Sequence, residues 1–121
     1  MGSNRLLSGD LWIVQLAEQI SSRVSRQVHN WKPFDKFGLG NQLTRAVDSI
    51  GLNISEGYAR AHLKERLQFF SIAEGSMEEA LFAIRQARER ELLSRLEASI
   101  LCGLLLKLGK AQKALTVALK N

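Results

Sequence analysis

This chain could bind a pair of metal ions only if its histidine and carboxylate side chains had a suitable spacing. A di-iron site in a helical bundle takes glutamates from several helices and Glu-x-x-His pairs, which place both ligands on one helical face. The chain has two histidines, His29 and His62, and neither follows a glutamate by three residues. The glutamates Glu74, Glu78 and Glu79 therefore lack imidazole partners, and we predict no metal or other cofactor.

Nucleophilic catalysis needs a serine or cysteine beside a base that can take its proton. Cys102 has no charged neighbour in the sequence to lower its pKa. Ser49 and Ser76 fall within helical patterns, out of reach of either histidine. Gly38-Leu39-Gly40 lacks the preceding strand and the lysine of a phosphate-binding loop. We predict that the protein is not an enzyme.

A line of polar residues accompanies the apolar stripe between residues 39 and 59. Its members follow one another by four, four and three residues, which places them on one helical face, and a glutamate of the next helix could meet them. They could form a partner-binding strip or a buried network that satisfies its own hydrogen bonds. We favour the structural network, which comprises Arg45, Ser49, Asn53, Glu56 and Glu79.

Positive charge is in excess: 17 Lys and Arg residues against 12 Asp and Glu give a formal net charge of +5. This excess favours an anionic partner, nucleic acid before membrane, although it could serve only solubility. In an up-down-up-down bundle, cations would gather at both ends, but acidic residues dilute them at one end and are few at the other. At the end with few acids, Tyr58 is a possible base-stacking surface. The candidate phosphate-binding residues are Arg60, Lys64, Arg66, Lys110, Lys113 and Lys120.

The elements that must position these residues are helices. A chain of 121 residues is large enough for one domain with a single core. Apolar residues recur at alternating spacings of about three and four, and strand-like alternation is nowhere sustained. We predict an all-α, antiparallel up-down-up-down four-helix bundle, preceded by a flexible arm over residues 1–7. The predicted helices are 8–28, 39–59, 63–89 and 94–119.

Local residues set the expected boundaries. Pro33 ends the first pattern, and we expect the aromatic residues of 29–38 to form a loop packed over one end of the bundle. Ser8 or Asp10 could cap the first helix. Ser94 and Glu97 fit a capping box at the start of the last helix.

A glycine in the middle of the third helix costs about 1 kcal/mol of helix propensity. We predict that Gly75 is there because another helix backbone approaches closely at that point. A bulky side chain at this position would then force the two helices apart.

Several ordered segments carry a resemblance to a known family. They cover about a third of the chain: Gln42-Leu43-Thr44-Arg45-Ala46, Ser49-Ile50, Asn53-Ile54-Ser55-Glu56-Gly57-Tyr58 with Arg60, Lys64-Glu65, Phe69-Phe70, Ala73-Glu74-Gly75-Ser76 and Glu79. The chain resembles the small four-helix bundle proteins encoded in intervening sequences of bacterial large-subunit ribosomal RNA genes. That family is related to the accessory variability proteins of diversity-generating retroelements. The resemblance implies the bundle fold and, since related proteins assemble as ring-like pentamers, a pentameric assembly.

The last helix is apolar over most of its circumference near Leu101, Leu105 and Leu106, which predicts a subunit contact there and hence a homo-oligomer. The resemblance supplies the pentamer. We predict a non-enzymatic, oligomeric accessory protein that binds RNA or DNA with little regard to sequence. The alternative is a protein–protein adaptor, for example one that docks a reverse transcriptase. A single cysteine and the lack of a long apolar segment predict a cytoplasmic protein with no membrane contact.

Overall fold

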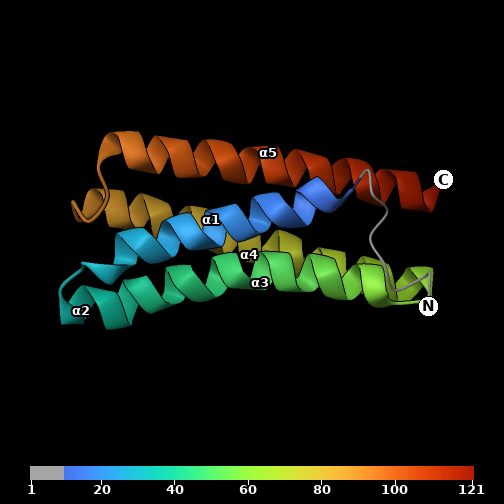
Figure 1. Ribbon diagram of the computed structural model, residues 1–121, viewed down its shortest axis with the longest axis horizontal. Helices are drawn as coiled ribbons and strands as arrows, with labels where there is room; N and C mark the ends of the chain where they lie inside the picture. The colour runs from blue at the N-terminus through green and yellow to red at the C-terminus, as the bar shows by residue number, and fades with distance from the viewer. Residues whose placement is uncertain (1–9) are drawn as a thin grey trace.

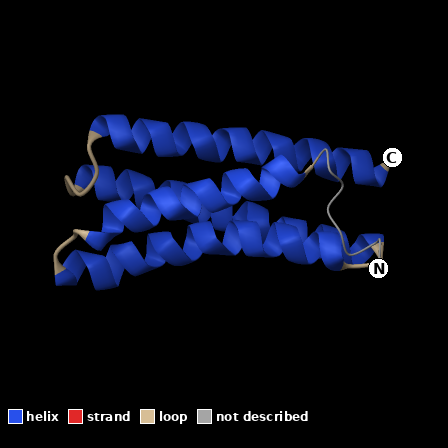
Figure 2. Ribbon diagram, viewed as in Figure 1, coloured by secondary structure: helices blue, strands red, loops and turns tan. Residues whose placement is uncertain are grey.

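Helices account for all regular structure in residues 10–121, the part of the chain that the computed structural model describes (Figures 1 and 2). The elements in order are α1 Leu11–His29, α2 Pro33–Asp35, the π-helical segment η2 Lys36–Gly40, α3 Asn41–Ala59, α4 Leu63–Glu89 and α5 Arg95–Lys120. The predicted all-α four-helix bundle is confirmed. The predicted arm over residues 1–7 and the capping candidate Ser8 lie outside the described residues.

The four long helices run alternately up and down, and each packs on the next along the chain. α3 and α4 make the most extensive contact, and α5 closes the bundle by packing on both α4 and α1. We call the two ends the hairpin end, where residues 60–62 join α3 to α4, and the loop end, where residues 30–32 and 90–94 join helices. They lie at the right and left of Figure 1, respectively.

Small side chains explain why α3 and α4 pack so closely. The buried face of α4 contains Ala73, Ser76, Ala80 and Ala83, which keep little volume between the two helix axes. Larger residues then fill the centre of the bundle between all four helices. The largest of them are Ile20, Leu43, Ile50, Ile54, Phe70, Ile84, Leu101, Leu105 and Leu108.

The start of α5 has the predicted N-cap, Ser94, but only half of the predicted capping box. The Ser94 hydroxyl accepts a hydrogen bond from the backbone N–H of Glu97 at 3.0 Å. The carboxylate of Glu97 instead accepts two hydrogen bonds from Arg23 of α1, at 2.6 and 3.0 Å. This bidentate bond raises the pKa of the Arg23 guanidinium and ties α1 to α5. Asp10 stands at the start of α1, but its side chain caps no backbone N–H.

The end of α4 carries a non-glycine residue in the left-handed region. Glu91 has φ of 61°, and its N–H bonds to the carbonyl of Arg88 at 3.0 Å. The next N–H, that of Leu92, bonds to the carbonyl of Ala87 at 2.8 Å. These two bonds form a Schellman motif, in which the left-handed position is usually a glycine.

The prediction of a loop over residues 29–38 is wrong from Pro33 onward. Proline has no N–H to donate, so it fits the first turn of a helix, and here it opens α2. α2, η2 and α3 then follow without a break in helical geometry. The five residues Lys36–Gly40 form a π-helical turn, a feature that often lies at functional sites.

The prediction of close helix approach at Gly75 is also wrong. A Cβ atom at Gly75 would meet nothing within 4 Å, because this glycine faces away from the core. The close approach occurs at Gly57, where a Cβ would stand 2.5 Å from the ring of Phe70. The glycine of α3 therefore makes room for the buried phenyl group of α4.

The buried seam of α5 consists of Ala98, Leu101, Leu105, Leu108 and Gln112. Gln112 is 1% exposed and donates from Nε2 to the carbonyl of Phe70 at 2.5 Å. Leu101 and Leu105 belong to this seam and are fully buried, so the predicted subunit contact through them is wrong. Only Leu106 of the predicted band is available to a partner, with 58% of its surface exposed. Within residues 10–121, no helix is long and apolar enough to cross a membrane.

Candidate functional site

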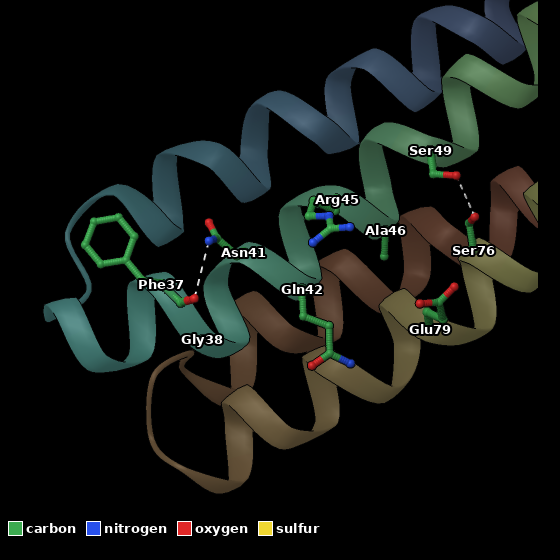
Figure 3. A pocket seen from close by; sticks show the side chains of 9 residues that line it. All are labelled: Phe37, Gly38, Asn41, Gln42, Arg45, Ala46, Ser49, Ser76 and Glu79. Carbon is green, nitrogen blue, oxygen red and sulfur yellow. Dashed lines mark hydrogen bonds between the residues drawn. The ribbon is translucent and has the colours of Figure 1, made fainter.

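A polar groove runs between α3 and α4 near the loop end (Figure 3). Its volume is about 570 Å³, within the ~300–1,000 Å³ range typical of small-molecule sites. The π-helical turn supplies one rim, and α3 and α4 supply the two walls. The lining residues are Phe37, Gly38, Asn41, Gln42, Arg45, Ala46, Ser49, Ser76 and Glu79.

Hydrogen bonds between hydroxyl and amide groups form the inner end of the groove. The hydroxyls of Ser49 and Ser76 lie 2.8 Å apart and join α3 to α4. Asn53 donates from Nδ2 to the carbonyl of Ser49 at 2.8 Å and to its hydroxyl at 2.9 Å. Of the predicted network, Ser49 and Asn53 are thus joined, with Ser76 as the partner on α4.

Arg45 and Glu79 take no part in that network. Both side chains are exposed, so their predicted burial is wrong. They line the groove from α3 and α4, yet no described residue forms a hydrogen bond or ion pair with either of them. The groove therefore holds a guanidinium and a carboxylate that do not neutralise each other.

Glu56, the last member of the predicted network, is engaged at the hairpin end instead. Its carboxylate pairs with the guanidinium of Arg60, one turn further along the chain. Arg60 also stacks over the ring of Phe69, 4.9 Å from its centroid. Arg66 donates from Nε to the carbonyl of Arg60 at 2.6 Å. Two of the predicted phosphate-binding residues, Arg60 and Arg66, thus hold the turn between α3 and α4.

The other four predicted phosphate-binding residues are free of such contacts. Their side chains are exposed, and no described carboxylate pairs with any of them. One opens α4, and three lie on the last turns of α5, so all belong to the hairpin half of the bundle. They are Lys64, Lys110, Lys113 and Lys120.

Tyr58 cannot serve as the predicted base-stacking surface, because its ring is buried. It is 6% exposed and packs edge-on against Phe70, with the ring centroids 5.9 Å apart. Burial raises the pKa of the Tyr58 hydroxyl well above its ordinary value, and the negative charge of Asp10 raises it further. This phenol is part of the core.

Two exposed aromatic side chains stand at the loop end, where the sequence predicts a packed cover. Phe34 is 85% exposed and Phe37 is 66% exposed. The ammonium of Lys36 lies 5.9 Å from the centroid of the Phe37 ring. The high density of aromatic and basic residues in 31–37 is the sequence signal for this surface, but it does not indicate which rings face solvent.

The two histidines are far apart. His29 ends α1 at the loop end and His62 precedes α4 at the hairpin end, and both are exposed. In the part of the chain that the structure describes, no three His, Cys, Asp or Glu side chains come together in a way that could hold a metal ion.

The fold and the groove together define a small all-α bundle with solvent-exposed polar and basic surfaces at its two ends. The chain belongs to a family described as 23S rRNA-intervening sequence protein, whose model matches residues 9–114. The description confirms the family that the sequence resembles and names no activity. No curated protein matches the chain.

Proposed function

We propose that the protein binds nucleic acid through its phosphates, at the hairpin end of the bundle. The observation that supports this most directly is the set of four exposed lysines without a carboxylate partner: Lys64, Lys110, Lys113 and Lys120. Phosphate contacts from lysine carry no sequence information, so binding is tolerant of sequence and steeply dependent on salt.

A salt-titrated binding assay on RNA and DNA duplexes tests this proposal. Replacing the four lysines together by glutamine should weaken binding and reduce the slope of log K against log salt by up to about 3–4, since each phosphate contact contributes ~0.9. Arg60 and Arg66 are left intact because they hold the turn.

The control removes the same charge elsewhere. Arg26, Arg85, Arg88 and Arg95 are exposed and have no described carboxylate partner, and replacing all four by glutamine lowers the net charge equally. Binding that falls equally in both quadruple variants would show that net charge, not the hairpin end, attracts the polyanion. Binding that is insensitive to salt would contradict the proposal outright.

The proposed assembly is a homo-oligomer whose subunits meet through the outer side of α5. Leu96, Leu106 and Val117 are large apolar residues exposed on that helix. The number five comes from the family resemblance. Repetition of the lysines around a ring would multiply weak phosphate contacts.

Light scattering checks the assembly. The unmodified protein should have the mass of an oligomer, and Leu106→Lys should shift it toward the monomer. Leu52→Lys is the matched control, because Leu52 is as exposed as Leu106 but lies on α3. A monomeric unmodified protein would contradict this part of the proposal.

A protein–protein adaptor is the second candidate function, and the same exposed leucines of α5 favour it. In that case the apolar side of α5 would receive another protein, such as a reverse transcriptase, and nucleic acid would not bind directly. A pull-down with nuclease treatment separates the two, because an adaptor retains its partner after the nucleic acid is digested.

A further inference from the structure

We propose that the groove between α3 and α4 binds an unpaired nucleobase of a single-stranded nucleic acid, which stacks on Phe37. This inference deepens the proposed function and rests on it, but it places the recognition of bases at the loop end, away from the four lysines. Three features of the groove support it: its unpaired charges, its aromatic rim and its size.

The charges supply both kinds of hydrogen-bonding group that a base edge needs. Arg45 presents donors and Glu79 presents acceptors to the same groove, and neither is used by a described residue. Gln42, between them and the rim, adds an amide with a donor and an acceptor. Arginine, glutamine and glutamate are side chains that bind base edges in known complexes.

The rim supplies a face on which a base can stack. Phe37 lines the groove and leaves 66% of its surface exposed, while Phe34, one turn earlier, is 85% exposed. Stacking of a base on an aromatic side chain is favourable for every base. The ammonium of Lys36, close to the Phe37 ring, provides a positive charge for the adjoining phosphate.

Two local contacts hold this rim in place. The carbonyl of Phe37 accepts a hydrogen bond from Asn41 Nδ2 at 3.3 Å. Gly40 lets the π-helical turn lie against α1, since a Cβ there would stand 2.7 Å from a methyl group of Val28. The stacking residue is therefore carried by a helical turn rather than by a loop.

Single strands fit this surface better than a duplex or a lipid surface does. The bases of a duplex are already stacked on one another, whereas an unpaired base can turn its face and edge toward the protein. A membrane surface would require the groove to place the carboxylate of Glu79 against lipid headgroups and tails, at a cost. The groove is also roomy enough for a nucleotide, at about 570 Å³.

Fluorescently labelled oligonucleotides test the proposal in the full-length protein. Single strands of eight nucleotides should bind more tightly than a duplex of the same length at high salt, where phosphate contacts weaken. Phe37→Ala should reduce single-strand affinity by about 5- to 100-fold, the range expected for loss of one stacked base. The double variant Arg45→Gln, Glu79→Gln should also reduce single-strand affinity, because it removes the two charged groups that would bind the base edge.

Phe82→Ala is the matched control, because Phe82 is an exposed phenylalanine of α4 that does not line the groove. Nucleoside monophosphates serve as competitors. Displacement of the oligonucleotide at millimolar monophosphate would identify a site for free nucleotides and would overturn the proposal. The absence of displacement supports a site for strands. Unfolding temperatures of all variants show that the bundle remains folded.

The outcomes separate this inference from the function on which it rests. If the lysine variants lose binding while Phe37→Ala binds normally and duplexes bind as tightly as single strands, the groove proposal is overturned and phosphate binding stands. If neither strands nor duplexes bind at any salt concentration, both are overturned. Binding to anionic vesicles that Phe34→Ala and Phe37→Ala abolish, with oligonucleotide binding unchanged, would show a membrane surface instead and would also overturn the groove proposal.

Discussion

The two ends of the bundle differ in the burial of phenylalanine. At the hairpin end, Phe70 is 1% exposed and lies under Gly57, against Tyr58. At the loop end, Phe34 is 85% exposed. The hairpin end thus buries Phe70 and Tyr58 in the core, whereas the loop end exposes Phe34 and Phe37. An exposed aromatic side chain contributes little to stability and remains available for binding.

Truncating one phenylalanine at each end gives the largest expected contrast. Phe70→Ala should lower the free energy of unfolding by about 3–5 kcal/mol, because it opens a cavity in the core. Phe34→Ala should change it by less than about 0.5 kcal/mol, as expected for an exposed site. Urea unfolding followed by circular dichroism measures both. Equal losses would mean that the two ends do not differ as the structure shows.

Two glycines give the next largest contrast in stability. Gly57→Ala should destabilise the fold by about 1–3 kcal/mol, because the new methyl group meets the Phe70 ring. Gly75→Ala meets nothing and should raise stability by about 0.5–1 kcal/mol through helix propensity. Thermal unfolding of the two variants gives the sign of each change, and a destabilised Gly75→Ala would restore the close-approach hypothesis.

The buried phenol of Tyr58 predicts a pH dependence at the hairpin end. Its pKa is raised in the folded state, so its contribution to stability is complete below the unfolded value of about 10 and is lost as the pH rises above it. Stability should therefore fall above about pH 10, and less so in Tyr58→Phe. Tyr58 is the only tyrosine, so tyrosinate absorbance reports this group alone. Ionisation near pH 10 without unfolding would contradict burial.

Two asparagines of α3 give the smallest contrast. Asn53→Ala removes two hydrogen bonds to Ser49 and should cost about 1 kcal/mol. Asn41→Ala removes one exposed bond to the carbonyl of Phe37 and should cost a few tenths of a kcal/mol, about the limit of measurement. A larger loss for Asn41→Ala would mean that the π-helical rim contributes to the stability of the whole bundle.

The sequence was sufficient to predict the hairpin of α3 and α4 because its apolar spacing and its turn leave few alternatives. The predicted bounds 63–89 agree with α4, and Ser94 caps α5 as expected. The burial of Gln112 in α5 was not predicted because this side chain is polar, whereas its hydrogen bond to the carbonyl of Phe70 accompanies its burial. The periodicity of apolar residues depends on side-chain type alone, so it cannot show that a polar residue has a buried hydrogen-bond partner.

The groove could not be predicted for related reasons. Pro33 was interpreted as the end of a helix when it begins one, so Phe37 was assigned to a covering loop. Gly75 was predicted to touch a neighbouring helix, but it lies on the side of α4 that faces away from the core. The residue type alone does not show which side of the helix packs inward. Arg45 and Glu79 were expected to be buried partners, but both side chains are exposed, and neither forms a hydrogen bond or ion pair with a described residue.

Glu91 is a position at which a substitution can raise the stability of the bundle. A side chain in the left-handed region costs roughly 1–2 kcal/mol relative to glycine. Glu91 is exposed, does not line the groove, and lies at the end of the bundle opposite the four lysines. Glu91→Gly should therefore relieve the backbone at the end of α4 without altering either surface. The resulting background would tolerate damaging changes such as Gly57→Ala, so that variants too unstable to purify from the original sequence could still be assayed for binding.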